Sequence, residues 1–149
     1  MMLKTHLAVS TALMLFFLPS VSSKLIFIPV ILIATLLPDI DCAYSTLGHH
    51  WIFKPLQFLT KHRGIVHSLT ICIVISLIFA FYIPVIALPF FLGYASHLFV
   101  DSFTEEGIRV FWPLSDSVTG KVRTGGAIEE GIFYATLLAN VVLLIALFI

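Results

Sequence analysis

Five apolar runs alternate with shorter polar stretches along this chain, and they restrict the fold more than any other feature. The runs are 3–18, 25–37, 65–83, 85–100 and 132–149. A helix that spans a membrane needs about 20 residues, with a range of about 17–25. The third and fifth runs reach this length directly, and the fourth reaches it with its flanks. The first two are short, so we interpret them as tilted spans or as a hairpin that enters the membrane partway.

The composition excludes an ordinary soluble domain. Of the 149 residues, 60% are hydrophobic and 11% are charged, and the mean hydropathy is +1.10. Soluble domains contain about 45–50% apolar and about 25% charged residues. The formal net charge is zero, so nothing indicates a nucleic-acid partner. We therefore predict a single all-α domain over residues 1–149, a polytopic membrane bundle of about four to five helices with the first two short, in contact with membrane lipid.

The first run has a rival interpretation as a secretory signal. Lys4, the apolar stretch that follows it and Val21-Ser22-Ser23 resemble a signal peptide with a small-residue cleavage site. Cleavage would remove His6 and leave the rest of the topology unchanged.

The distribution of basic residues predicts the orientation. With five crossings, the N-terminus and both polar stretches, 39–64 and 102–131, lie on the same side of the membrane. That side carries most Lys and Arg residues, whereas the other side carries only Lys24. Basic residues are enriched in cytoplasmic loops, so we expect the first side to face the cytoplasm. Its basic residues are Lys4, Lys54, Lys61, Arg63, Arg109, Lys121 and Arg123.

Histidines and carboxylates gather at the cytoplasmic ends of all five runs. Ionisable groups against membrane segments are costly and tend to be functional. Because these ends lie at one depth, we expect the side chains to converge on one site. The residues are His6, Asp39, Asp41, His62, His67, His97, Asp101, Glu129 and Glu130.

The spacing and chemistry of these residues favour a divalent metal. His97 and Asp101 are four residues apart and share one helix face. Gly93, one turn earlier, allows another helix to approach, and Gly64 lets the segment between His62 and His67 bend. Imidazole and carboxylate ligands suit zinc, manganese or iron. We predict about one to three ions, with zinc favoured over manganese.

A metal held in this way predicts hydrolysis of a phosphoester at the cytoplasmic membrane face. The metal generates a hydroxide nucleophile and polarises a phosphoryl oxygen. Arg63 is suited to bind the phosphate, and Asp39 or Asp41 to act as general base. Two other functions stay open: a divalent-cation transporter with the same ligands, and a non-catalytic membrane protein whose metal only joins short helices.

Four motifs carry a resemblance to a known family over most of the chain. They are Leu-Leu-Pro-Asp-Ile-Asp (36–41), His-Arg-Gly-Ile-Val-His-Ser (62–68), Gly-Tyr-Ala-Ser-His-Leu-Phe-Val-Asp (93–101) and Gly-Ile-Arg-Val-Phe-Trp-Pro (107–113). The chain resembles the YdjM family of LexA-regulated, membrane-bound, predicted metal-dependent hydrolases. More distantly, it is similar to zinc-dependent phospholipase C and P1-type nucleases.

The resemblance implies an inner membrane hydrolase that acts on a phospholipid or on a small-molecule phosphoester. The family pattern has a histidine near the N-terminus, which His6 matches, and this favours a retained first helix. It also has a glutamate after a glycine-containing loop. In Gly125-Gly126-Ala127-Ile128-Glu129 that residue is Glu129, so the resemblance favours Glu129 over Glu130 as a metal ligand.

Overall fold

A computed structural model describes residues 1–41, 51, 54, 64–114 and 116–149 of the chain, and within these residues the fold is all-α. Five α-helices are present there, and the first two have 15 and 13 residues, so the predicted bundle with two short initial helices is confirmed. The helices are α1 (Leu3–Phe17), α2 (Lys24–Leu36), α4 (Leu69–Tyr82), α5 (Pro84–Ser102) and α6 (Ala127–Ala146).

Two short 3-10 helices follow the first two α-helices. Leu18–Ser20 (η1) contains Pro19, and Leu37–Asp41 (η2) contains Pro38. Proline removes a backbone N–H and its ring clashes with the preceding turn, so an α-helix does not continue through it easily. The tighter turn of η2 presents Asp39 beyond the end of α2.

Two apolar runs differ in length from the expectation: the first, with its 3-10 helix, is longer, and the third forms a shorter helix. Helices α1 with η1, α5 and α6 are long and apolar enough to cross a membrane, whereas α4 has only 14 residues. The run that begins at residue 65 does not form a helix before Leu69, because the Ser68 hydroxyl accepts a hydrogen bond from the Ile71 N–H and caps the helix there. The Leu69 N–H donates to the Val110 carbonyl, which ties this start to the segment after α5.

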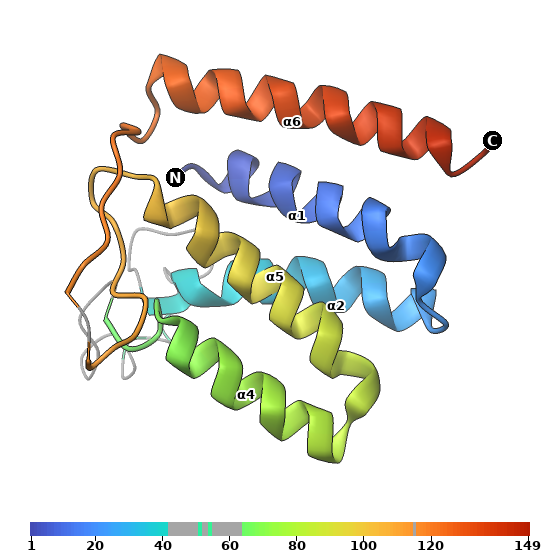
Figure 1. The fold of residues 1–149 in the computed structure, drawn as a ribbon, viewed down its shortest axis with the longest axis horizontal. Helices are drawn as coiled ribbons and strands as arrows, with labels where there is room; N and C mark the ends of the chain where they lie inside the picture. Colours follow the sequence, from blue (N-terminus) through green and yellow to red (C-terminus); the bar gives the residue numbers. More distant parts are fainter. Residues whose placement is uncertain (42–50, 52–53, 55–63, 115) are drawn as a thin grey trace.

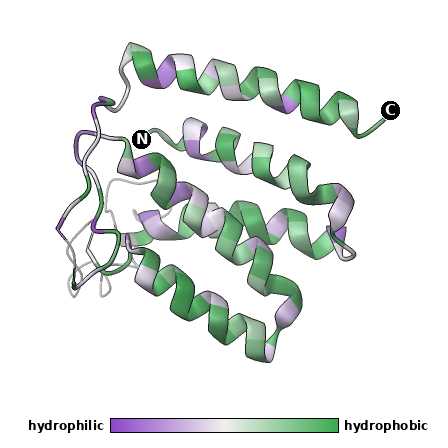
Figure 2. Ribbon diagram, viewed as in Figure 1, coloured by the Kyte–Doolittle hydropathy of each residue, from purple (hydrophilic) through white to green (hydrophobic). Residues whose placement is uncertain are grey.

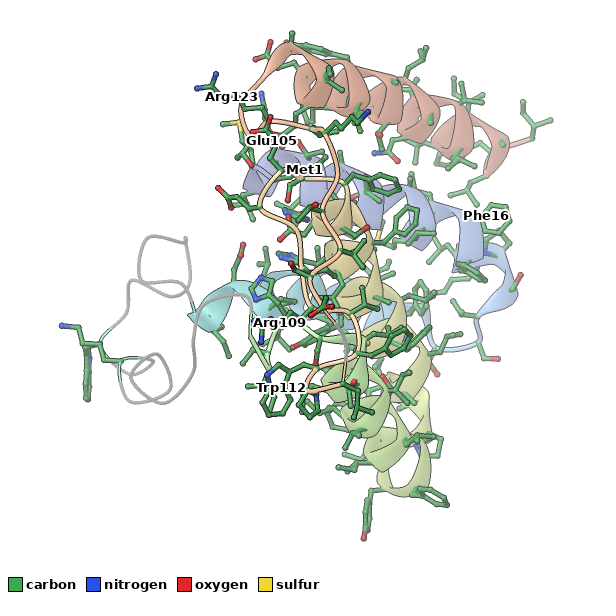
Figure 3. All side chains as sticks on the ribbon, turned by 60° about the vertical axis from the view of Figure 1, so that its left-hand side comes forward. Met1, Phe16, Glu105, Arg109, Trp112 and Arg123 are labelled. Atoms are coloured by element: carbon green, nitrogen blue, oxygen red, sulfur yellow. The ribbon has the colours of Figure 1, made fainter. Side chains whose placement is uncertain are left out.

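The helices lie side by side, and α5 is central (Figure 1). It packs against α2, α4 and α1, while α6 packs along α1. The ends of α2 and α5 and the starts of α1, α4 and α6 lie at one end of the bundle, on the left of Figure 1. Figure 3 turns this end forward and shows Met1, Arg109 and Arg123 on it, with Phe16 at the far end. The predicted convergence of five helix ends is therefore present.

A glycine brings α2 and α5 close together. A Cβ atom at Gly93 would overlap the Ile31 carbonyl oxygen and lie 3.0 Å from the Ala34 Cβ. Only a residue without a side chain permits this crossing, as expected from the sequence. The contact fixes how the ends of these two helices sit relative to each other.

The outer faces of the bundle are apolar (Figure 2). Phe81 of α4 and Leu138 of α6 are 83% and 67% exposed, respectively. The interior of the bundle holds a compact apolar core that includes Cys72, Phe90 and Tyr94. Figure 2 shows hydrophilic residues concentrated at the left end, where the connecting segments lie. The exposed apolar belt requires lipid around it, in agreement with a membrane bundle.

Candidate metal centre

Five predicted ligands from four segments meet at the polar end of the bundle. They are His6 on α1, Asp39 on η2, His67 before α4, and His97 and Asp101 on α5. The three imidazoles and the Asp101 carboxylate are almost completely buried, whereas the Asp39 side chain is 26% exposed. We call these five residues the His/Asp cluster. Its open side is therefore the side of Asp39.

The first group in the cluster consists of His6, His97 and Asp101. The ligand atoms that these three residues offer lie within 4.8 Å of one another. Asp101 Oδ1 is 3.3 Å from His6 Nε2, and Asp101 Oδ2 is 3.5 Å from His97 Nε2. The two imidazole rings are stacked, with centroids 3.9 Å apart. The Met1 amino group also donates to Asp101 Oδ1 at 2.5 Å.

The second group consists of Asp39, His67 and His97. Asp39 Oδ1 lies 3.7 Å from His97 Nε2 and 3.9 Å from His67 Nε2. Asp101 Oδ2 is also 3.9 Å from His67 Nε2, so this carboxylate lies against both groups. Because His97 belongs to both groups, the cluster is one continuous site rather than two separate ones.

The cluster fits a divalent metal by geometry and by its buried polar atoms. Two ligand atoms that share a zinc ion at about 2.0–2.2 Å lie roughly 3.4 Å apart in a tetrahedral site. The nitrogen–oxygen separations in the cluster are 3.3–3.9 Å. Moreover, His97 Nε2 is buried without a hydrogen-bond partner among the described residues. Buried polar atoms are normally satisfied, and a cation would satisfy this lone pair.

A backbone carbonyl of α2 orients His97. His97 Nδ1 donates to the Thr35 carbonyl at 2.8 Å. Thr35 lies in the last turn of α2, where helical carbonyls have no partner within the helix. Since a carbonyl only accepts, the neutral imidazole carries its proton on Nδ1 and has its lone pair on Nε2, which faces Asp39 and Asp101. Such outer hydrogen bonds orient metal-binding histidines. The sequence does not identify Thr35, because its side chain takes no part.

Tyr94 is a second residue that the sequence does not single out. Its hydroxyl donates to the Val66 carbonyl at 2.5 Å, directly before His67. Tyr94 lies one helical turn before His97, so α5 both carries one histidine of the cluster and holds the turn that carries another. The motif around residues 93–101 contains this tyrosine, but its contact depends on a segment 28 residues away.

Glu129 is buried next to the cluster but belongs to neither group. Its Oε1 accepts hydrogen bonds from the Met2 N–H at 2.6 Å and the Thr5 hydroxyl at 2.8 Å. Its Oε2 accepts from the N–H of Gly125, whose φ of +75° suits glycine. The carboxylate thus joins the start of α6 to the start of α1, next to His6. The prediction that it binds metal stays a prediction.

The side chains of three other predicted site residues lie outside what the structure describes. Asp41 ends η2, but only its backbone is described. His62 and Arg63 lie outside the described residues, so their roles as ligand and phosphate contact stay predictions.

The chain has several relatives among known proteins. A family model described as YdjM inner membrane protein matches residues 1–148. The inner membrane protein YdjM of Escherichia coli (strain K12) is 39% identical over 97 residues, which cover 58% of this chain and 48% of the relative. The uncharacterized protein YvsG of Bacillus subtilis (strain 168) is 32% identical over 85 residues, covering 54% and 53%. The chain therefore matches about half the length of these relatives. No solved structure matches it.

Proposed function

The chain belongs to the family of YdjM inner membrane proteins, and from its buried His/Asp cluster we propose that it is a membrane-bound, metal-dependent hydrolase of a phosphoester. The observation that carries the proposal is that four segments of an apolar bundle converge on three histidines and two carboxylates. Burying such groups costs free energy unless they are paired or hold a metal. Imidazole with carboxylate suits zinc, or manganese as the second choice.

We assign the residues of the cluster as follows. His6, Asp39, His67, His97 and Asp101 would hold the metal, which supplies a hydroxide nucleophile and polarises a phosphoryl oxygen when bound. The Thr35 carbonyl keeps the proton of His97 on Nδ1, away from the cluster. The Asp39 side chain is 26% exposed, so its alternative role is that of general base, in which its carboxylate accepts the proton of the attacking water instead of binding the metal.

The remaining predicted residues complete the proposal. Asp41, His62 and Glu129 are proposed as further ligands, with Asp41 as an alternative general base, and Arg63 as the residue that binds the phosphate. Arginine matches phosphate oxygens with two parallel hydrogen bonds. The proposed site faces the cytoplasm, where the basic residues of the chain gather.

The first test is the metal content of the detergent-purified chain, measured by plasma mass spectrometry. The wild type is expected to hold about one to three zinc or manganese ions per chain. The variant His97→Ala, Asp101→Ala is expected to lose them, because it removes the residue shared by both groups and the carboxylate against both. Asp116→Ala, which removes an exposed acid at the same end, is the matched control. Wild-type protein that holds no metal after reconstitution with zinc and manganese would contradict the proposal.

A metal that only stabilises the fold is the second candidate, because the cluster joins four segments at one point. Both functions predict that a chelator lowers the melting temperature, since metal binding and folding are linked. The two functions differ in whether the protein hydrolyses a phosphoester. Metal-dependent hydrolysis of a phosphoester panel, lost in the His97→Ala, Asp101→Ala variant, supports the hydrolase. Metal binding without turnover of any phosphoester would favour the structural metal.

A further inference from the structure

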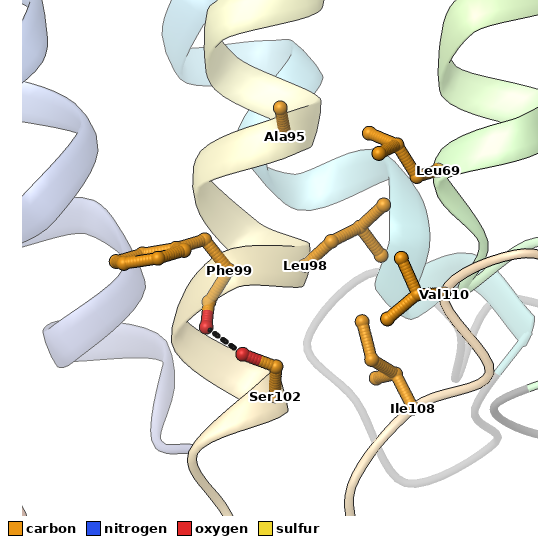
Figure 4. A pocket seen from close by; sticks show the side chains of 7 residues that line it. All are labelled: Leu69, Ala95, Leu98, Phe99, Ser102, Ile108 and Val110. Carbon is orange, nitrogen blue, oxygen red and sulfur yellow. Dashed lines mark hydrogen bonds between the residues drawn. The ribbon is translucent and has the colours of Figure 1, made fainter. Parts of the chain in front are cut away.

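An apolar cavity lies beside the His/Asp cluster, on a neighbouring face of α5. Its volume is about 280 Å³. Figure 4 shows side chains from three segments around it: α5, the start of α4 and the segment after α5. The lining residues are Leu69, Ala95, Leu98, Phe99, Ser102, Ile108 and Val110.

The described lining of the cavity is almost entirely apolar, so it does not favour a polar ligand. The one hydroxyl in its lining, on Ser102, already donates to the Phe99 carbonyl at 2.6 Å (Figure 4). The floor of the cavity is well packed, because Leu98 and Ile108 are only 3% and 2% exposed and belong to the apolar core. A preformed cavity with apolar walls suits a hydrocarbon group.

The position of the cavity links it to the cluster. Leu98 and Ser102 directly follow His97 and Asp101 in the chain, and Leu69 lies two residues after His67. Ala95, Leu98, Phe99 and Ser102 are spaced three and four residues apart, so they form one stripe of α5 next to the stripe of His97 and Asp101. A ligand that reaches the cluster with a polar group therefore has an apolar cavity within the same end of the bundle.

We propose that this cavity holds an acyl chain of a lipid phosphoester whose phosphate lies at the His/Asp cluster. The inference rests on the proposed function and narrows its substrate class to lipids. Lipid is the occupant because α5 is long and apolar enough to cross a membrane and the Phe99 side chain, which lines the cavity, is 63% exposed on the outer surface of this helix. An acyl chain can thus enter from the membrane without crossing water.

The cavity can be filled by substitution and compared with a matched control. Ala95 is half-buried in the lining, so Ala95→Phe places a ring in the cavity. Ala135→Phe makes the same change on an exposed face of α6, away from this cavity. Ala95→Leu is a smaller filling variant, used in place of Ala95→Phe if the melting temperature shows that the ring disrupts folding.

Photolabelling tests occupancy directly, without requiring turnover. The full chain is placed in phosphatidylcholine nanodiscs with phosphatidic acid that carries a diazirine near the end of one acyl chain. We expect labelled peptides from residues 84–123 in the wild type, and at least tenfold less label there in Ala95→Phe but not in Ala135→Phe. Equal labelling of these peptides in wild type and Ala95→Phe would overturn the proposal. So would conversion of a dimer to a monomer by Ala95→Phe in light scattering, which would assign the cavity to a second copy.

Turnover then separates this inference from the proposed function. Wild type and variants are assayed with phosphatidic acid vesicles and with para-nitrophenyl phosphate, a soluble phosphoester. The ratio of lipid to soluble turnover is expected to fall at least tenfold in Ala95→Phe and to stay constant in Ala135→Phe. An unchanged ratio in Ala95→Phe overturns the acyl site and leaves the hydrolase intact. Wild-type protein that hydrolyses neither substrate counts against the hydrolase, and the labelling result then decides whether the cavity holds the lipid.

Discussion

His97 has a central position among the residues of the site. It belongs to both groups of ligand atoms, stacks on His6 and is held by the Thr35 carbonyl. Asp101, one helical turn later, lies against both groups as well. Two residues of one helix therefore connect the contributions of α1, η2 and the turn before α4. Loss of either one is expected to affect the whole cluster rather than a single contact.

Glu129 gives a prediction that separates positioning from metal binding. Glu129→Ala leaves three donors, two N–H groups and a hydroxyl, without their acceptor. The Thr5 hydroxyl is buried, and a buried unsatisfied group costs about 1–3 kcal/mol, so we expect the free energy of unfolding to fall by about 2 kcal/mol. Glu129→Gln keeps an acceptor, so a positioning role predicts the wild-type metal content, whereas the predicted ligand role implies that metal is lost.

Denaturant titration and plasma mass spectrometry measure these two effects. Asp101→Asn is the comparison, since it changes a carboxylate inside the cluster in the same way. If Glu129→Gln loses as much metal as Asp101→Asn does, Glu129 is a ligand, as the resemblance implies.

The sequence predicts the members of the site better than their arrangement. Clustering of His and Asp at one side of the membrane is visible in the positions of the apolar runs, and the pair His97 and Asp101 is visible in its spacing. The sharing of His97 between two groups depends on how α1, α2 and α5 rotate about their axes. That rotation is set by contacts between distant residues, such as Thr35 with His97, which no local pattern records.

Among the elements, the crossing of α2 and α5 has the strongest influence on the site. Asp39 follows α2 and His97 lies on α5, so the separation of these helices sets the distance between two predicted ligands. The Gly93 backbone contacts Ile31 at this crossing. A similar dependence holds for α4, whose start at Leu69 leaves residues 64–68 free to form the turn that carries His67. The sequence pattern predicted a helix from residue 65, because the apolar run continues through the turn before Leu69.

Substitution of Gly93 tests the crossing. In Gly93→Ala the added methyl overlaps the Ile31 carbonyl, so α2 and α5 must separate. Overpacking of this kind costs about 1–3 kcal/mol. We also expect weaker metal binding, measured as a higher dissociation constant in a zinc competition titration.

Gly131→Ala is the matched control for this substitution. A Cβ there meets no atom within 4 Å, and alanine favours a helix over glycine by about 1 kcal/mol. The control is therefore expected to be neutral or stabilising with unchanged metal affinity. Equal effects of the two substitutions on zinc affinity would contradict the role of the crossing.

At the scale of the whole molecule, the predicted site residues whose side chains the structure describes lie at one end of the bundle. Transport sites usually lie near the middle of the membrane, where both sides can reach them. The His/Asp cluster instead lies where the polar connecting segments after α5 are, and the described helices are mostly hydrophobic from there to the turn between α1 and α2 at the far end (Figure 2). This asymmetry favours a site that works from one side of the membrane. The proposed function therefore depends on which side of the membrane this end of the bundle faces.

Labelling of single engineered cysteines tests that orientation. Ser22 lies between α1 and α2 at the far end, and Ser117 lies in the segment after α5 at the end of the cluster; both are exposed. In a background with Cys42→Ser and Cys72→Ala, Ser22→Cys is expected to react with a membrane-impermeant maleimide in intact cells. Ser117→Cys is expected to react only after the membrane is opened, because basic loops stay in the cytoplasm. The reverse pattern would place the His/Asp cluster on the outer side of the inner membrane and restrict its substrates to those available there.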